Sequence, residues 1–369
     1  MEEDHRERYA IFYCNRDRYI VAGKVGSGGF GTVWAARNYK TGEYIALKIL
    51  TPRHRKGWRK TQRLVGQGEG TILPKLNHAH IIRHFFSYGW GPRDGCIVIG
   101  LELMTGSVDK LARSLPSPLP LNFVRAVLHQ MLQALDYLAV RRLVHRDVKP
   151  DNILYTTTCE ADYPGVLPVT CYRFVLGDFG LCDVEAPTTT FSTSTSLASS
   201  SSNAAGSSSN INNNNKDDDN DGLSICGTFG YRPPEVYEGF WWQRDPPHPA
   251  KATHKSDVWA LFVTALWLLD ADGFRRVMER LGNGIGERRL IGMVQRLAEE
   301  EEQVREFRRM AEGDWQQRAT AREVLEGCFE GVGVAERVVE VEVEERKEEV
   351  KEEEAEEEEE SREEGDEIL

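Results

Sequence analysis

Three polar side chains with complementary chemistry occur within six residues, at Asp147, Lys149 and Asn152. A carboxylate can accept the proton of a hydroxyl group, a lysine can neutralise an oxygen of a phosphoryl group, and a side-chain amide can bind a metal ion. The whole run from residue 145 to 152 reads His-Arg-Asp-Val-Lys-Pro-Asp-Asn, which is hard to obtain by chance. These residues indicate chemistry at a phosphoryl group.

A glycine-rich stretch nearer the N-terminus is suited to binding phosphates. It runs from Gly26 to Gly31 and lies between two strand-like segments, 19–25 and 32–36. Glycines allow backbone N–H groups to approach a phosphate without obstruction by side chains. A dinucleotide-binding site would need a helix directly after the glycines. Because a second strand follows instead, the sequence argues against a nicotinamide enzyme.

Lys48 lies in the middle of an apolar, strand-like run, residues 44–50. A buried lysine needs an acidic or phosphate partner, because an isolated buried charge is costly. The alternative is a lysine at a sheet edge whose charged end reaches solvent.

Together these motifs resemble those of the eukaryotic protein-kinase family. The run 145–152 resembles the catalytic loop of that family, and the lysine at position 149 resembles its serine/threonine form. Residues 178–180, Asp-Phe-Gly, resemble its metal-binding triplet. Residues 224–235 resemble its substrate-positioning loop and Ala-Pro-Glu motif, with Pro233 in place of alanine.

The resemblance implies a protein kinase that uses ATP and Mg²⁺ and phosphorylates serine or threonine in protein substrates. The implied catalytic residues are Asp147, Lys149, Lys48 and Glu69, with Glu69 pairing with Lys48. The implied nucleotide-binding residues are Gly26, Ser27, Gly28, Gly29, Phe30, Gly31, Val33, Ala46, Lys48, Glu102, Met104, Asn152, Leu154 and Asp178. Asn152 and Asp178 are the implied metal ligands. The alternative is a pseudokinase that serves as an ATP-binding or scaffolding module.

The implied fold is α+β with two lobes, a small mainly β lobe (18–103) and a larger mainly α lobe (104–330). Residues 1–17 are expected to form a loose extension. Residues 187–221 are rich in Ser, Thr, Asn and Asp and predict a disordered insertion. Residues 331–369 predict an acidic, disordered tail.

Several elements follow from residue patterns. Helical periodicity predicts a helix over 122–140, with Phe123, Val127, Met131, Leu135 and Leu138 on one face. The apolar run 258–269 predicts a buried helix. The glycines around Glu69 predict a short or mobile helix there. Residues 156–172 are expected to be irregular, and residues 270–315 carry little of the family pattern.

Two further expectations come from the resemblance. Arg318 would pair with Glu235, and His84 falls where the family places an apolar residue of an internal stack. The proposed regulatory residues are Ser224, Thr228 and Arg146. Ser224 would be phosphorylated and would bind Arg146, which is expected to lack a partner until then. Alternatively, Ser224 simply ends a serine-rich linker.

Net charge is unevenly distributed along the 369 residues. The chain has a formal net charge of −13, but residues 336–369 contain 19 acidic and 5 basic residues, so the remainder is nearly neutral. A nucleic-acid binder acting through the basic residues 53–60 is therefore disfavoured. The seven scattered cysteines and the absence of a signal-like N-terminus predict an intracellular protein, cytoplasmic or nuclear. We expect a monomer with no membrane segment.

Overall fold

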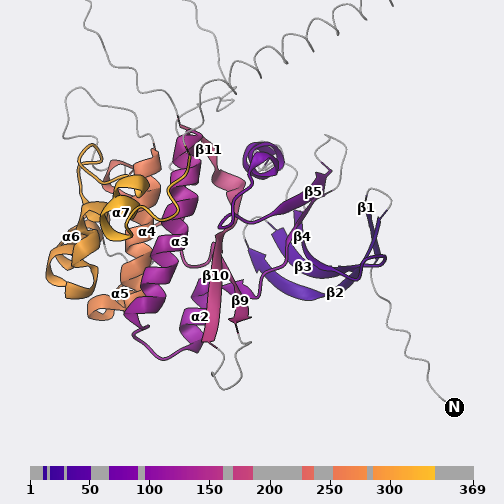
Figure 1. Cartoon of the computed structure of the whole chain (residues 1–369), viewed down its shortest axis with the longest axis horizontal. Coiled ribbons are helices and arrows are strands. Elements are labelled where there is room, and N and C mark those ends of the chain that lie inside the picture. Colours follow the sequence, from indigo (N-terminus) through magenta and orange to yellow (C-terminus); the bar gives the residue numbers. More distant parts are fainter. Residues whose placement is uncertain are drawn as a thin grey trace, which may run out of the picture.

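Six antiparallel strands form the N-terminal part of the protein, and helices dominate the remainder (Figure 1). The computed structural model describes residues 11–14, 17–28, 31–50, 66–89, 96–160, 169–185, 227–236, 252–280 and 286–336. The strand order in the sheet is β1-β2-β3-β4-β6-β5. The strands are β1 (Ile11–Cys14), β2 (Asp17–Gly28), β3 (Gly31–Asn38), β4 (Tyr44–Leu50), β5 (His84–Tyr88) and β6 (Ile97–Glu102). The predicted α+β class is confirmed.

The first strand corrects the expectation of a loose extension at residues 1–17. Strand β1 pairs with β2, with Ile11 opposite Ile20 and Cys14 opposite Asp17. Isoleucine, phenylalanine and tyrosine, which fill most of β1, favour strands. The charged residues on both sides of this short run conceal the signal in the sequence.

Strand β4 lies in the middle of the sheet and carries Lys48. The lysine is opposite Val33 on β3 and Ile99 on β6. Its neighbours Ala46 and Leu47 are buried. The sheet therefore fixes Lys48 on both sides, and the alternative of a lysine at a sheet edge is excluded.

A single π-helical turn, η1 (Gly66–Ile72), and a 3₁₀ turn, η2 (Leu73–Lys75), connect β4 to β5. The prediction of a short helix around Glu69 is confirmed. Glycine is a poor helix former, because it loses more backbone entropy than other residues on folding. Leu73 is buried and attaches the turn to the main core.

The helical part is built around two long helices that pack against each other. Helix α3 (Leu121–Val140) lies between α4 (His254–Leu269) and strand β10 (Val169–Leu176) (Figure 1). The predicted face of α3 is buried, with Phe123 half-buried. Helix α4 is buried from Ser256 to Leu269, as its apolar sequence predicted. The other elements of the helical part are α2 (Val108–Ser114), α5 (Phe274–Arg280), α6 (Glu287–Glu300), η8 (Glu302–Ala311) and α7 (Ala321–Cys328); of these, α5, α6 and η8 pack against α4, and α7 packs against α3.

Residues 270–315, which carry little of the family pattern, still fold onto this core. Helix α6 and the 3₁₀ segment η8 bury an apolar stripe made of Leu290, Ile291, Val294, Leu297, Ala298, Val304, Phe307, Met310 and Ala311. Apolar residues spaced along one face suffice for such packing, whatever the identity of the polar residues between them.

A long hairpin replaces the irregular stretch expected at 156–172. Strands β9 (Ile153–Glu160) and β10 pair throughout, from Leu176 opposite Ile153 to Val169 opposite Glu160. Three consecutive threonines in β9 favour a strand, because β-branched side chains suit a pleated sheet. The short strand β7 (Gly106–Ser107) pairs with the other edge of β9.

The segment after α7, residues 328–335, turns back along α3; we call it the C-terminal strap. Gly331 and Gly333 adopt positive φ angles of 73° and 82°, which reverse the chain direction. Hydrogen bonds to α3 hold the strap, from Arg125 Nη2 to Cys328 O (3.3 Å), between His129 Nε2 and Val332 O (3.0 Å), and from Ala335 N to Asp136 Oδ2 (2.8 Å). Arg322 on α7 also donates to Ala335 O. The predicted start of the disordered tail at residue 331 is therefore wrong, because residues 331–336 belong to the folded part.

We expect a chain that ends at Glu330 to be less stable than one that ends at Glu336. The shorter chain loses the hydrogen bond from Ala335 to the buried carboxylate of Asp136, which also pairs with Arg322 at 3.1 Å. A bond of this kind contributes about 2 kcal/mol. Urea unfolding of the two chains measures the difference. Equal unfolding free energies would show that the strap does not support α3.

Candidate active site

The loop that carries Asp147 is fixed on the buried helix α4. Short strands β8 (Leu143–Val144) and β11 (Asp183–Val184) pair beside it. The backbone N–H groups of His145 and Arg146 donate to the carboxylate of Asp257, at 2.7 and 2.8 Å. Asp257 lies at the start of α4 and is buried. Helix α3 therefore leads into the loop, and α4 holds it.

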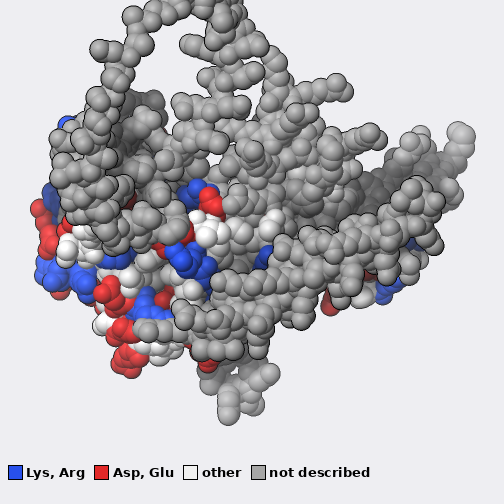
Figure 2. All heavy atoms as spheres, turned by 90° about the horizontal axis from the view of Figure 1, so that it is seen from above, with Lys and Arg blue, Asp and Glu red and all other residues white. Residues whose placement is uncertain are grey.

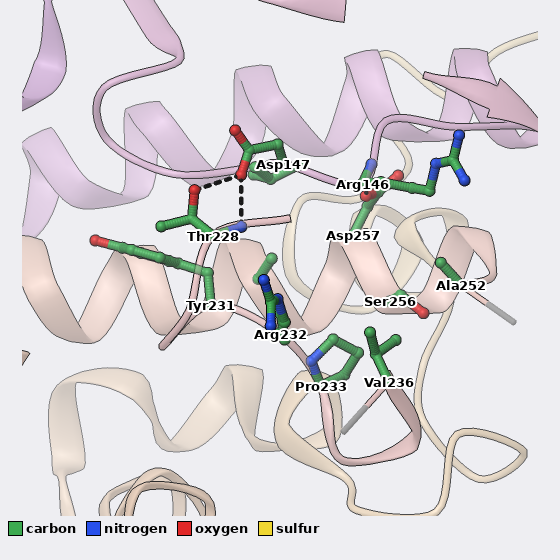
Figure 3. A pocket seen from close by; sticks show the side chains of 12 residues that line it. Arg146, Asp147, Thr228, Tyr231, Arg232, Pro233, Val236, Ala252, Ser256 and Asp257 are labelled. Atoms are coloured by element: carbon green, nitrogen blue, oxygen red, sulfur yellow. Dashed lines mark hydrogen bonds between the residues drawn. The ribbon is translucent and has the colours of Figure 1, made fainter. Parts of the chain in front are cut away.

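The carboxylate of Asp147 is surrounded by donors (Figure 3). Thr228 donates to its Oδ1 from both the backbone N–H (2.9 Å) and the hydroxyl (2.6 Å). Lys149 Nζ lies 2.7 Å from its Oδ2 and also donates to the Thr228 hydroxyl at 2.6 Å. Asn152 Nδ2 donates to the same Oδ2 at 2.9 Å. The sequence had grouped Thr228 with regulatory residues, but the structure places it against this acid.

These contacts keep Asp147 ionised. Burial by itself would raise the pKa of this carboxyl, but the charge and hydrogen bond of Lys149, with the Thr228 hydroxyl, lower it overall. Asp147 is therefore a carboxylate near neutral pH, which is the form that can accept a proton.

A second group of charges joins β4, η1 and the 178–180 triplet. Lys48 Nζ lies 2.6 Å from Glu69 Oε1 and 2.8 Å from Asp178 Oδ1. The predicted pairing of Lys48 with Glu69 is thus formed. Burial would lower the pKa of Lys48, but the carboxylates of Asp178 and Glu69 outweigh it and raise the pKa. Lys48 is a fixed cation.

Asn152 and Asp178 offer oxygen atoms of the kind that Mg²⁺ prefers. The Asn152 amide nitrogen faces Asp147, so its amide oxygen lies on the opposite side of the group. Gly177 N donates to Asn152 O at 2.8 Å, which ties Asn152 to the residue before Asp178. Carboxylate and amide oxygens are hard ligands suited to this ion. The described residues contain no cluster of three or more acidic, histidine or cysteine side chains that could hold a metal.

The residues assigned to nucleotide binding lie on the strands beside these charges. Gly26, Ser27 and Gly28 end β2, and Gly31 begins β3, whereas Gly29 and Phe30 lie outside the described residues. A Cβ atom at Gly31 would lie 2.3 Å from Ile49 O, so this position needs glycine. Val33 is half-buried on β3, Ala46 is buried on β4, Leu154 lies on β9, and Met104 is buried just after β6. Binding of a nucleotide by these residues stays a prediction.

Glu102, at the end of β6, makes an ion pair that the sequence did not suggest. Arg173 on β10 binds both of its carboxylate oxygens, at 2.7 and 3.0 Å. Arg173 also donates to Ala79 O at 3.1 Å. A bidentate Arg–carboxylate pair has defined geometry. It therefore links the sheet to the helical part where the chain crosses between them.

A family model described as protein kinase domain matches residues 19–202. The chain belongs to the protein-kinase family. Serine/threonine-protein kinase TAO2 of Homo sapiens is 31% identical over 168 residues, which are 46% of this chain and 12% of TAO2. The Aurora kinase of Saccharomyces cerevisiae is 26% identical over 254 residues, which are 69% of this chain and 53% of the relative. Serine/threonine-protein kinase TIO of Arabidopsis thaliana is 36% identical over 138 residues, which are 37% of this chain and 10% of TIO. The chain thus spans between a tenth and about half of the length of these relatives.

The kinase fold places aromatic and apolar side chains between the two lobes. The rings of His145 and Phe179 meet edge to face, with centroids 4.9 Å apart. His84 is half-buried on β5, and its Nε2 has no hydrogen-bond partner among the described residues. Burial lowers the pKa of His84. A neutral imidazole therefore stands where the family resemblance implied an apolar side chain.

Gly68, one residue before Glu69, packs directly on the backbone of the Asp-Phe-Gly triplet, residues 178–180. A Cβ atom at this position would lie 1.8 Å from Phe179 O and 3.4 Å from Cys182 N. Only glycine lets η1 approach the backbone this closely. The close approach helps to bring Glu69 and Asp178 to the same lysine.

We expect Gly68→Ala to lower kcat about 10²-fold, because a displacement near 1 Å at a reacting group has an effect of that size. The added methyl group must push η1 away from Phe179 and so disturb the contacts of Lys48. Steady-state kinetics measures the loss. Gly292→Ala on α6 is the matched control, because its Cβ would meet nothing within 4 Å. An unchanged kcat in the Gly68 variant would contradict this prediction.

Glu235, which precedes helix α4 in the chain, is anchored to the core by a buried arginine. Arg318 is fully buried, and its Nη1 and Nη2 donate to the two carboxylate oxygens of Glu235 at 2.7 and 2.9 Å. Ser256 also donates to Glu235, at 3.0 Å. The predicted pairing of Arg318 with Glu235 is confirmed.

The prediction that Arg146 lacks a partner until a phosphate binds is wrong. Its Nε donates to Leu181 O at 2.6 Å, and its Nη2 lies 2.9 Å from Asp183 Oδ2. Arg146 therefore has partners without any phosphate. Ser224 lies outside the described residues, and its phosphorylation stays a prediction. No sequence motif pointed to Asp183, because its role depends on the pairing of β11 with β8.

Proposed function

We propose that this chain is an active serine/threonine protein kinase that transfers the γ-phosphoryl group of ATP to protein hydroxyl groups. The observation that carries the proposal is the presence of two clusters of charged and polar side chains, one around Asp147 and one around Lys48. Asp147 is held by Lys149, Asn152 and Thr228, and Lys48 joins Glu69 to Asp178. Phosphoryl transfer needs mainly positioning and charge neutralisation, which such groups supply.

Each side chain has a distinct role in this proposal. Asp147, ionised and buried, accepts the proton of the substrate hydroxyl. Lys149 neutralises charge on the transferred group and holds Thr228 beside the acid. Lys48, oriented by Glu69, binds phosphates of ATP. The glycine-rich turn between β2 and β3 covers those phosphates.

Mg²⁺ would be held by Asn152 and Asp178 together with phosphate oxygens, and it supplies neutralisation of the charge that develops on the phosphates. Lys48 keeps the pKa of the half-buried Asp178 lowered, although desolvation would raise it, so this carboxylate stays available as an anionic ligand. The links from Gly177 to Asn152 and to His145 hold the two ligands on one rigid support.

A pocket beside Asp147 fits a protein substrate (Figure 3). Its lining combines Asp147 and Thr228 with the apolar side chains of Pro233 and Val236, and with Tyr231. In this proposal, a substrate side chain near the acceptor hydroxyl contacts these apolar groups while the hydroxyl lies near the acid. We propose a protein substrate that presents serine or threonine to Asp147.

The described residues on one face carry charges of both signs. On the face in Figure 2, Lys and Arg side chains of the described residues lie intermixed with Asp and Glu side chains. Nucleic-acid binding usually needs a basic patch. No helix in the described ranges combines the length and apolarity needed to cross a bilayer. We propose a monomer without a nucleic-acid partner that acts inside the cell, in the cytoplasm or nucleus.

Transfer of labelled phosphate from ATP to a generic basic protein tests the function. We expect labelled phosphoserine and phosphothreonine, a linear time course, and no labelled phosphotyrosine. The alternative, a pseudokinase, predicts nucleotide binding without transfer. Binding of ATP measured by calorimetry in the same preparation separates that result from a misfolded protein.

A further inference from the structure

Two exposed arginines follow helix α3, and neither has a carboxylate partner among the described residues. The guanidinium of Arg141 lies over the ring of Tyr137, 3.6 Å from its centroid, and donates to Tyr137 O at 3.3 Å. Arg142 contributes its carbonyl oxygen, which accepts from Glu185 N at 2.7 Å. The Glu185 carboxylate itself lies 3.1 Å from His254 Nδ1. Both guanidinium groups can therefore bind a carboxylate from outside the described residues.

The loop before β5 adds positive charge at the same place. The ring of His78 packs on that of Tyr137, with centroids 4.8 Å apart. Burial, together with the neighbouring His80 and Arg141, lowers the pKa of His78 to about 4. Lys75, three residues earlier in this loop, is exposed. We call the group formed by Lys75, His78, Arg141 and Arg142 the basic surface.

An exposed apolar side chain lies beside these cations. Val184 on β11 is 60% exposed and pairs across strands with Leu143, the residue after Arg142. Figure 1 shows β11 next to the end of α3 from which the basic surface projects. The surface therefore suits a segment that carries both acidic and apolar side chains.

The C-terminal strap leads the chain toward the basic surface. Val332 binds His129 and Ala335 binds Asp136, so the strap runs along α3 in the direction of its C-terminal end. Arg141 lies about 8 Å beyond Asp136 along the axis, because an α-helix rises about 1.5 Å per residue. An extended chain covers about 3.3 Å per residue, so about three residues are enough to cover this distance.

Residues 337–369, which we call the acidic tail, have a matching composition. They include 18 acidic and 5 basic residues, and valine alternates with glutamate over residues 339–344. In an extended segment, successive side chains point to opposite sides, so the valines separate from the glutamates. The glutamates at 340, 342 and 344 complement the two arginines, and the valines complement Val184.

We propose that the acidic tail binds the basic surface of its own chain through residues 339–344. This inference does not depend on the proposed kinase function. The strap attaches the tail beside the surface, which gives the tail a high effective concentration there. An acidic segment of another protein would have to displace it.

Carbodiimide coupling in the full chain tests this contact. The reagent joins a carboxylate to an amine that touches it, and Arg142→Lys places an amine on the surface while keeping the charge. In the monomer, mass spectrometry should find position 142 coupled to glutamates at 340, 342 or 344. Arg276→Lys, on α5 at the other end of the helical part (Figure 1), is the matched control. Its coupling to the tail should be at least about tenfold lower, because no attachment holds the tail near it.

Salt should weaken the contact in the same experiment. At about 1 M salt the Debye length falls to about 3 Å, so attraction between exposed charges is largely screened. Coupling at position 142 should therefore fall several-fold between about 0.1 M and about 1 M salt.

Amide hydrogen exchange gives a second readout. The amides of residues 339–344 should exchange about tenfold faster in Arg141→Gln with Arg142→Gln than in the wild type, the size expected for loss of two exposed ion pairs. Arg276→Gln with Arg280→Gln removes two charges on α5 and should leave this exchange unchanged.

Several outcomes would overturn the proposal. Coupling only between different molecules would show that the tail binds another chain. Coupling chiefly to Lys56 and Lys60 would place the tail on the basic run 53–60 instead. Equal exchange in the wild type and the Arg141/Arg142 double variant would show that these arginines only complement the dipole of α3.

Discussion

Asp147→Asn is expected to lower kcat by about 10²–10⁴-fold, the contribution usual for a positioned proton acceptor. Asparagine has nearly the same size, and its one oxygen can accept either the hydrogen bonds of Thr228 at the Oδ1 position or those of Lys149 and Asn152 at the Oδ2 position. It cannot take a proton from the substrate hydroxyl at neutral pH. The fold should therefore persist while turnover is lost.

Steady-state transfer from labelled ATP measures the effect, together with calorimetric ATP binding. Binding should change little, because Asp147 faces the acceptor hydroxyl in the proposed mechanism. Asp272→Asn, on the surface beside Arg296, controls for the same chemical change elsewhere. If purified Asp147→Asn kept near-wild-type kcat, the assignment of the proton acceptor would be wrong.

Lys48→Met is expected to lower kcat/KM for ATP by about 10²–10³-fold, as found when a preorganised positive group is removed from an active site. The change also leaves Glu69, which is 1% exposed, without its lysine. Removal of one partner from a buried ion pair typically costs about 3 kcal/mol of stability. Lower activity and lower stability should therefore appear together in this variant.

The double variant Lys48→Met with Glu69→Gln separates the two effects. Replacing the second charge removes the unpaired buried carboxylate, so part of the stability should return. Activity should remain low, because no cation binds the phosphates. Lys24→Met, at an exposed position of β2, is the control for a lysine change in the same sheet. Full recovery of activity in the double variant would show that Lys48 acts only on stability.

The sequence was most informative where short motifs carry chemistry. The resemblance of short motifs to the protein-kinase family predicted Asp147, Lys149, Asn152, Lys48 and Asp178 as site residues, and the structure places them in two neighbouring clusters. The pairing of Lys48 with Glu69 was also predicted, although glycines around Glu69 weaken the helix signal. Periodicity was sufficient for α3, whose apolar residues repeat at helical spacing over several turns, whereas α4 was predicted from its continuous apolar run.

The sequence was least informative where a strand signal was short or surrounded by polar residues. Strand β1 is only four residues long, and the outer part of the β9–β10 hairpin consists largely of threonines and other small residues. Pairing with a neighbouring strand decides such cases, because a strand gains its hydrogen bonds only from that neighbour. The folding of residues 331–336 onto α3 likewise depends on Asp136, which lies about 200 residues earlier in the chain.

Contacts between distant segments were decided only by the tertiary structure. Thr228 donates to Asp147 across 81 positions, and Arg173 binds Glu102 across 71. Gly68 is needed because Phe179 comes from another part of the chain. Asp183 meets Arg146 because β11 pairs with β8. Sequence motifs specify which chemical groups are present, whereas the partner of each buried charge depends on which strands and helices pack together. The physical reason is that an unpaired charge is costly to bury, so a buried charge binds a complementary group that the fold brings close to it.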